Sequence, residues 1–96
     1  MALINYVKGY IASKNPAFVV IDANGIGYGL YVSLQTFSKI TDRQEAQLFV
    51  ESVYIRDDNP KFYGFAEEEE RELFRKLISV SGVGGASAIL MLSSLS

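Results

Sequence analysis

Hydrophobic and polar residues alternate along most of residues 1–65, and this period of two predicts β-strands. In one clear case, Ala17, Val19 and Ile21 share one face of the expected strand while Phe18 and Val20 share the other. A short segment with a weak helical pattern interrupts the series. We therefore expect three strands, a short helix and two further strands, over residues 3–11, 17–23, 27–33, 34–40, 45–55 and 61–65.

Turn residues between these segments support the predicted order. Asn24 and Gly25 both accept the positive φ that a type I′ hairpin turn requires. Gly9 is a position where the first strand can bend, and Pro60 ends any pairing before the fifth strand. Five strands with a helical piece between the third and fourth are the layout of an OB-fold barrel. The alternation of hydrophobic and polar residues does not decide whether the barrel closes, and a small open sandwich is the alternative.

From Ala66 onward the hydrophobic period becomes helical. The apolar residues of the first helical segment, residues 67–80, fall on one face and are Leu73, Phe74, Leu77 and Ile78. The acidic run Glu67–Glu70 stands at the start of this helix and matches its dipole, and we interpret it as a solvated helix start. The spacing also predicts ion pairs four residues apart, Glu67–Arg71 and Glu72–Lys76.

Glycines then interrupt the helical pattern at positions 82, 84 and 85. The pattern resumes in residues 86–94, with an apolar stripe of Ile89 and Leu90 beside Ala86 and Ser93. Because the turn is tight, we expect Gly82 and Gly84 to be required. The first amides of the second helix lack intrahelical partners and face the positive end of its dipole, so they suit a phosphate oxygen. A plain helical hairpin, whose glycines only turn the chain, fits the same sequence.

Amino-acid composition limits the kinds of active site and the class of protein that this sequence can form. A chain of 96 residues is expected to form one domain with a small appendage. The absence of cysteine and histidine excludes a disulfide scaffold, cysteine-ligated zinc, a thiol nucleophile and the usual general base. Lys8 and Lys14 follow the first apolar residues, unlike the charges of a signal peptide, and the last twenty residues are too polar for a spanning helix. We expect a soluble cytoplasmic protein with no cofactor and no metal.

Charge is unevenly distributed around the net value of −2. Residues 1–44 carry a net +2 and residues 45–96 a net −4. Two of the acids, Asp57 and Asp58, stand side by side after Arg56 in a predicted loop. Adjacent carboxylates can bind Mg²⁺ or act as an acid and base, and they also form ordinary turns. A third interpretation is a negative tip that repels DNA phosphates.

Exposed aromatic residues are a second means by which the chain could bind nucleic acid. Tyr10, Tyr31 and Tyr54 are the tyrosines expected to be exposed. Exposed aromatic rings stack on the bases of single strands. On strands, aromatic residues also form the core or cross-strand pairs.

Five segments carry a family resemblance: INYVKGYI, VVIDANGIGYGLYVS, VYIRDD, YGFAEEEERELFRKLISVSGVG and ILMLSSLS. In these segments the chain resembles the RuvA family, the Holliday-junction-binding subunits of the bacterial branch-migration complex. The resemblance covers essentially the whole sequence. It implies an OB-fold domain over residues 1–65 and the start of a helical domain over residues 66–96, with the first of two helix-hairpin-helix motifs.

The resemblance also implies roles for particular residues. Gly82, Val83, Gly84 and Gly85 fall on the turn that binds DNA phosphates. Asp57 and Asp58 fall on an acidic pin at the junction centre, with Arg56 beside it as a DNA-facing base. Where the family often has proline and lysine, this chain has Gly85 and Ala86, so its turn is expected to bind phosphate through backbone donors.

Partners follow from the resemblance as well. It implies a homotetramer on four-way junction DNA, acting in recombination, repair and the SOS response to DNA damage. The ATPase would be the motor RuvB, bound through a C-terminal domain, and the resolvase RuvC would be a further partner. Family members continue to a second hairpin motif, a linker and a third domain, so we expect this sequence to be the N-terminal part. No chemistry is expected from the chain itself.

Two other function classes are compatible with the residues. The first is an assembly module that mainly tetramerises through its barrel. The second is an enzyme, such as a helix-hairpin-helix glycosylase or nuclease. Such enzymes need a catalytic lysine or aspartate after the turn, and no charged residue follows Lys76.

Overall fold

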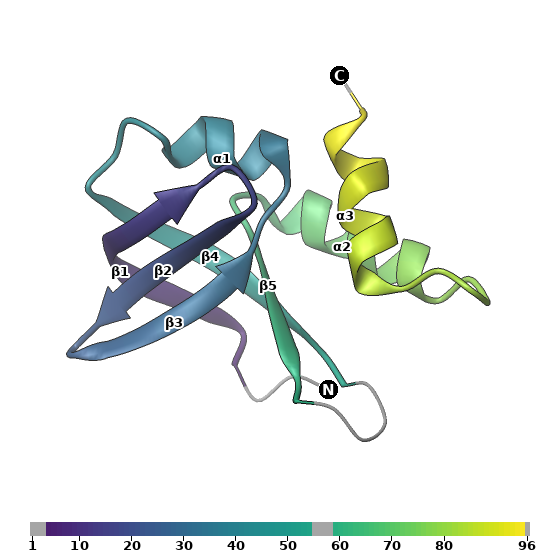
Figure 1. Ribbon diagram of the computed structural model, residues 1–96, viewed down its shortest axis with the longest axis horizontal. Helices are drawn as coiled ribbons and strands as arrows, with labels where there is room; N and C mark the ends of the chain where they lie inside the picture. Colours follow the sequence, from purple (N-terminus) through teal and green to yellow (C-terminus); the bar gives the residue numbers. More distant parts are fainter. Residues whose placement is uncertain (1–3, 55–58, 96) are drawn as a thin grey trace.

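The computed structural model describes residues 4–54 and 59–95 of the chain (Figure 1). Its strands form a closed barrel in the order β1-β2-β3-β5-β4, which confirms the predicted five-stranded layout and decides against an open sandwich. Short helix α1 lies across one end of the barrel, and α2 and α3 lie beside β5 (Figure 1). The elements are β1 (Tyr6–Asn15), β2 (Phe18–Ala23), β3 (Ile26–Tyr31), α1 (Leu34–Ile40), β4 (Glu45–Val53), β5 (Lys61–Phe65), α2 (Glu68–Ile78) and α3 (Gly85–Ser93).

The predicted alternation produces the barrel core. Alternate residues of β2 and β4 are buried, and they meet side chains from the other elements inside the barrel. The buried residues of this core are Val7, Val19, Ile21, Leu30, Val32, Ile40, Ala46, Leu48 and Val50. Most neighbouring strands run antiparallel, and the barrel closes where β3 pairs with β5 in parallel through Tyr31 and Tyr63. Closure removes the exposed edges that an open sheet of this length would present to other chains.

Gly25 and Gly9 are both needed in the barrel, but for different structural reasons. Asn24 has a φ of 55° and Gly25 a φ of 87°, as the predicted type I′ turn requires. Gly9 does not mark the irregularity of β1, because the register shifts between Ile11 and Ser13. Instead, a Cβ atom at Gly9 would lie 2.8 Å from the carbonyl carbon of Asp22, so glycine allows β2 to approach closely.

A second hydrophobic cluster joins the helices to the barrel. It contains Tyr63 and Phe65 from β5, Phe74 from α2, and Ala88 and Leu92 from α3. Both predicted helices are present. The helical face expected for the first of them is largely confirmed, since Leu77 and Ile78 pack on this cluster; only Leu73 is exposed.

The stripe predicted for α3 is confirmed only in part: Ile89 packs on the second hydrophobic cluster, whereas Leu90 does not. The buried residues of α3 are Gly85, Ala88 and Leu92, whereas Leu90 is 71% exposed and Ile89 only half-buried. The reason is steric: the small residues let α3 approach Tyr63 and Phe74, and larger side chains on that face would hold it away. Hydrophobicity alone therefore put Leu90 on the buried face and overlooked Gly85, Ala88 and Leu92.

Charged residues of α2 attach it to the barrel. The expectation of a solvated helix start is confirmed for Glu67, Glu68 and Glu69, which are exposed, and is wrong for Glu70. The Glu70 carboxylate accepts hydrogen bonds from Ser33 Oγ and Thr36 Oγ1, at the start of α1. Arg71 is only 3% exposed and donates to the carbonyl of Asn5 at 2.9 Å. The ion pairs on α2 are also spaced differently from the prediction: they are Glu68–Arg71 and Glu72–Arg75, three residues apart, and Glu67 pairs with Lys39.

Candidate nucleic-acid interface

The glycine turn connects α2 to α3 through residues 79–84. It is closed by two backbone hydrogen bonds, from Val80 N to Leu77 O and from Val83 N to Val80 O, both at 3.1 Å. Gly82 has a φ of +86°, so the prediction that glycine is required there is confirmed. The same prediction is wrong for Gly84, which has a φ of −91° and no atom within 4 Å of a Cβ position.

Backbone donors are free at the point where α3 begins. Gly84 is the N-cap residue, and its carbonyl accepts the first helical hydrogen bond from Ala88 N at 3.0 Å. Within residues 4–54 and 59–95, the amides of Gly84, Gly85 and Ala86 have no acceptor. The amide of Val83 is already bonded inside the turn. The donors available to an anion are therefore those of the first turn of α3, which contains no acidic residue.

Tyr63 of β5 lies directly beneath this helix start. A Cβ atom at Gly85 would lie 2.6 Å from Cζ of Tyr63 and closer still to its hydroxyl oxygen. The ring is held between Phe74, at a centroid distance of 4.9 Å, and Tyr31, at 5.6 Å. Burial, assisted by the neighbouring Tyr31, raises the pKa of Tyr63 above its ordinary value, so its hydroxyl stays protonated at neutral pH.

A cavity of about 270 Å³ opens beside the start of α3. It is lined by Ala17, Tyr31, Val32, Lys61, Tyr63, Ala86, Ile89 and Leu90. Lys61 is the cation of this set, and its ammonium lies 5.9 Å from the centre of the Tyr31 ring. The cavity therefore combines a cation, a tyrosine hydroxyl and a helix N-terminus with a mainly apolar lining.

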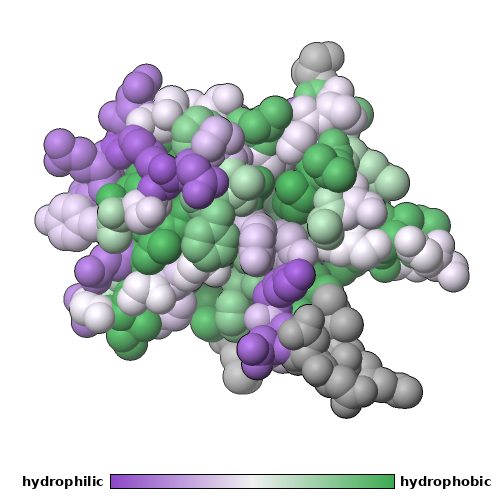
Figure 2. Space-filling model, viewed as in Figure 1, coloured by the Kyte–Doolittle hydropathy of each residue, from purple (hydrophilic) through white to green (hydrophobic). Residues whose placement is uncertain are grey.

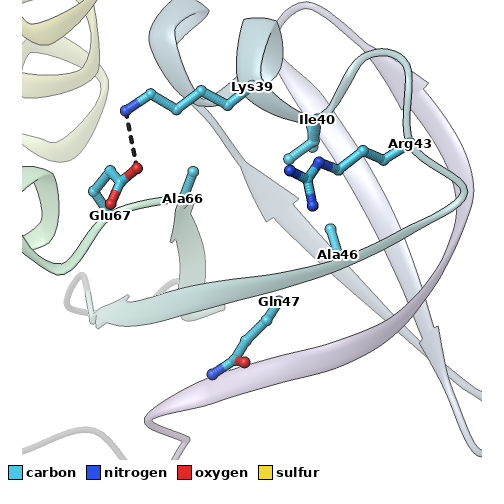
Figure 3. A pocket seen from close by; sticks show the side chains of 7 residues that line it. All are labelled: Lys39, Ile40, Arg43, Ala46, Gln47, Ala66 and Glu67. Carbon is cyan, nitrogen blue, oxygen red and sulfur yellow. Dashed lines mark hydrogen bonds and ion pairs between the residues drawn. The ribbon is translucent and has the colours of Figure 1, made fainter.

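Another cavity, of about 400 Å³, lies at the opposite end of α2, where α1, β4 and the β5–α2 connection meet (Figure 3). Its lining includes Lys39 and Arg43, and Lys39 points across it to Glu67. These two side chains form an ion pair at 3.3 Å. Because a carboxylate already neutralises the ammonium, this cavity is a weaker anion site than the start of α3.

Hydrophobic residues cover the outer face of α3. Figure 2 shows their green side chains over this helix, whereas purple hydrophilic side chains gather on the other side of the barrel. The exposed apolar residues on and around α3 are Val80, Leu90, Met91 and Leu95. No helix among the described residues combines the length and apolar character that crossing a membrane requires. An exposed apolar surface of this kind favours contact with another protein segment.

Exposure of the three predicted tyrosines is confirmed, but they lie on different elements. Tyr10 is on β1, Tyr31 on β3, and Tyr54 follows β4. Tyr31 also packs edge-on against Phe18 at 4.9 Å, which is the cross-strand pairing that was the alternative to stacking on bases.

The predicted acidic pin, Asp57 and Asp58 with Arg56, lies outside the described residues. Its proposed role therefore stays a prediction. Among the residues that are described, no group of three or more acidic side chains is arranged to hold a metal ion.

Sequence reasoning missed Lys61 and Tyr63 as parts of a site. Both lie in a segment whose pattern indicates only a core strand, 18 and 16 residues before the turn begins at residue 79. No local signal distinguishes them, because their proximity to Ala86 depends on how α3 packs on β5.

Comparison with known proteins gives consistent matches. A family model described as the RuvA N terminal domain matches residues 3–64. A protein of Christiangramia forsetii named Holliday junction branch migration complex subunit RuvA is 50% identical over 93 residues, which cover 97% of this chain and 48% of that protein. Proteins of the same name from Bacteroides fragilis and Neisseria meningitidis are 49% and 44% identical, covering 98% and 97% of this chain and 46% and 48% of theirs. The chain spans about half the length of these curated relatives.

Proposed function

The chain belongs to the RuvA family, and from that premise we propose that it is a non-catalytic, structure-selective binder of four-way junction DNA. The observation that carries this proposal is the row of amides at the start of α3 that have no acceptor in the described part of the chain, next to the turn that the family resemblance assigns to phosphate binding. The names of the relatives describe those proteins as subunits of a Holliday junction branch migration complex, and junction binding by this chain would fit that role.

Phosphate binding would work through the main chain. The amides of Gly84, Gly85 and Ala86 would donate to a phosphate oxygen, and the positive end of the α3 dipole would add to the attraction. Gly82 and Val83 would shape the turn, since the Val83 amide is bonded within it. Contacts of this kind carry no sequence information, so selectivity would come from the shape of the junction.

Within the same proposal, Asp57 and Asp58 form the acidic pin. Four copies of the chain would surround the junction, and the paired carboxylates would repel phosphates at its centre and help to separate strands. Arg56 would face the DNA beside them. Exchange of Asp57 and Asp58 for asparagine should therefore raise affinity for the junction, which a comparison of dissociation constants measures.

We propose a separate role for each of the two segments of the chain. Residues 1–65 would form the oligomerising barrel, and residues 66–96 would begin the DNA-binding helical domain. The whole protein would work in the cytoplasm with a motor ATPase, RuvB, and with the resolvase RuvC, during recombination and the repair of damaged DNA in the SOS response. The chain itself would bind DNA and leave ATP hydrolysis to the motor.

The direct test compares binding to a four-way junction and to a linear duplex of the same sequences and length. We expect tighter binding to the junction at low salt, with affinity that falls steeply as salt rises. Equal affinity for the two DNAs would contradict the proposal.

Exposed apolar side chains on α3 favour a second candidate, a module that mainly assembles and has little DNA affinity of its own. Leu90 and its exposed neighbours would then lie in a contact with another chain or domain. Light scattering over a range of concentrations separates the candidates: tetramers without junction binding would favour assembly, and a strict monomer would exclude it.

A further inference from the structure

Groups from two distant parts of the chain converge at the start of α3. The helix supplies free amides, β5 supplies the Tyr63 hydroxyl, and β5 also supplies the Lys61 ammonium. We propose that Tyr63 and Lys61 complete a phosphodiester-binding site with the first amides of α3. This inference rests on the proposed function, because it names two side chains that would hold the same DNA phosphate.

Tyr63 is the strongest indication of a ligand. The residue is only 4% exposed, and no hydrogen bond joins its hydroxyl to the described residues; the hydroxyl oxygen is not among the buried polar atoms that lack a partner, so this end of the side chain reaches solvent. The buried ring therefore presents a solvent-accessible hydroxyl to the cavity that Lys61 and Ala86 also line. The rings of Phe74 and Tyr31 hold the side chain in place, so its hydroxyl is fixed beside Gly85. A protonated hydroxyl at this position is a ready donor to a phosphate oxygen.

Lys61 supplies the positive charge. Its ammonium forms no ion pair within the described residues and lies over the Tyr31 ring. Lys61 and Ala86 line the same cavity. A cation from the barrel therefore lies beside the first turn of α3, a helix that has no charged residue of its own. The cavity thereby acquires a net positive field although the whole chain is acidic.

Helix α3 leaves room for the phosphate. Its first turn has no acidic residue that would compete for the free amides, and Gly84 and Ala86 are small and exposed. Apolar side chains, among them Val32 and Ile89, form most of the remaining lining. A lining of this kind lowers the local dielectric constant and strengthens each hydrogen bond to a charged ligand.

The first experiment removes only the hydroxyl. Tyr63→Phe should weaken junction binding about tenfold, the usual effect of losing a hydrogen bond to a charged group. The melting temperature should stay unchanged or rise, because the hydroxyl forms no hydrogen bond with residues 4–54 or 59–95. Tyr6→Phe is the matched control, since Tyr6 is exposed on β1 and lies outside the cavity. Equal affinity of the two variants would overturn the assignment of Tyr63.

The second experiment removes the charge. Lys61→Gln should reduce the slope of log affinity against log salt concentration by about one, as expected for one lost phosphate contact. Lys8→Gln, an exposed exchange on β1, loses the same charge away from the cavity and should change the slope less. An unchanged slope for Lys61→Gln would remove this residue from the site.

Inorganic phosphate tests the site without DNA. Titration of the labelled chain should shift the amide resonances of Gly84, Gly85 and Ala86, and Tyr63→Phe should reduce these shifts at equal phosphate concentration. If the chain fails to bind a junction but phosphate still shifts these amides, the proposed function fails and the site stands. If junctions bind while the variants match their controls, the site is wrong and the function stands. Absence of any shift with phosphate overturns the site.

Discussion

Helices α2 and α3 are neighbours that attach to the same barrel by different means. Helix α2 uses charged side chains: Glu70 accepts hydrogen bonds from two hydroxyls of the α1 region, Arg71 donates to Asn5 just before β1, and Arg75 pairs with Glu51 of β4. Helix α3 has no charged residue and attaches mainly by the close packing of Gly85, Ala88 and Leu92 on Tyr63 and Phe74, with one hydrogen bond from Leu34 N to Ser93 Oγ at 3.1 Å. Directional hydrogen bonds fix the orientation of α2, while the small residues of α3 allow close contact without occupying its backbone donors.

This difference has a consequence for the site. Because an isolated buried charge is very costly, the buried guanidinium of Arg71 is partnered within the protein through Nη1 and Nη2, although its Nε has no hydrogen-bond partner among the described residues. Polar groups at the start of α3 remain unpartnered within the described residues. The structural polar network and the candidate binding groups are therefore separated between two adjacent helices.

The largest expected effect comes from breaking the attachment of α2. Arg71→Met removes the donor to the Asn5 carbonyl and the guanidinium that lies 5.4 Å from the centre of the Phe49 ring. We expect a loss of about 3 kcal/mol in the free energy of unfolding, as for other buried charged groups. Urea denaturation measures it. Lys76→Met, on the exposed side of α2, is the control and should change stability by less than about 0.5 kcal/mol.

The next effect tests the close packing of α3. Gly85→Ala places a Cβ atom against Tyr63, and we expect a loss of about 2 kcal/mol because the ring is held on both sides. Gly84→Ala has open space around its Cβ and no positive φ, so its effect should be small. Thermal melting of the two variants compares them directly. Equal losses would show that the turn, and not the contact with Tyr63, makes glycine necessary.

A smaller effect is expected at Glu70. Glu70→Gln weakens the hydrogen bonds that the carboxylate accepts from Ser33 and Thr36, with an expected loss of about 1 kcal/mol. Glu69→Gln makes the same chemical change at an exposed neighbouring position and should be close to neutral. Chemical denaturation of both variants in one buffer distinguishes them. A neutral result at Glu70 would restore the interpretation of the whole acidic run as solvated.

The smallest expected effect concerns Tyr63, which contacts Phe74 of α2 and lies beneath Gly85 of α3. Because the folded state raises the pKa of Tyr63 above the ordinary value of 10.0, folding favours the protonated hydroxyl. The contribution is present below pH 10.0 and is lost as the pH rises from there through the folded-state pKa. The wild-type chain should therefore lose more stability than Tyr63→Phe across this alkaline range, which melting curves at several pH values measure. An equal loss of stability in the wild-type chain and in Tyr63→Phe would show that folding does not raise the pKa of Tyr63.

Much of the fold was predictable because its signals are local. The alternation of residues 17–23 and the Asn24-Gly25 turn define a hairpin without reference to the rest of the chain. Likewise, the change of period at Ala66 and the glycines after residue 80 locate two helices and the turn between them. The candidate phosphate turn follows from these same signals, since free amides accompany every helix start.

Contacts between distant segments were not predictable in this way. The acidic run looks solvated in sequence, yet Glu70 is bonded to residues more than thirty positions earlier. The exposed face of α3 carries the larger hydrophobic residues, so a rule that buries the most apolar face fails there. Tyr63 and Lys61 meet Ala86 only because α3 packs on β5.

The sequence by itself determined the type and order of the elements and the position of the glycine turn, because each depends on periodicity or on the backbone preferences of a few adjacent residues. The tertiary structure alone decided which face of α3 is buried, which charges are structural and which side chains stand beside the free amides. The physical reason is that these outcomes depend on steric fit and desolvation between segments far apart in the chain, which no local pattern encodes.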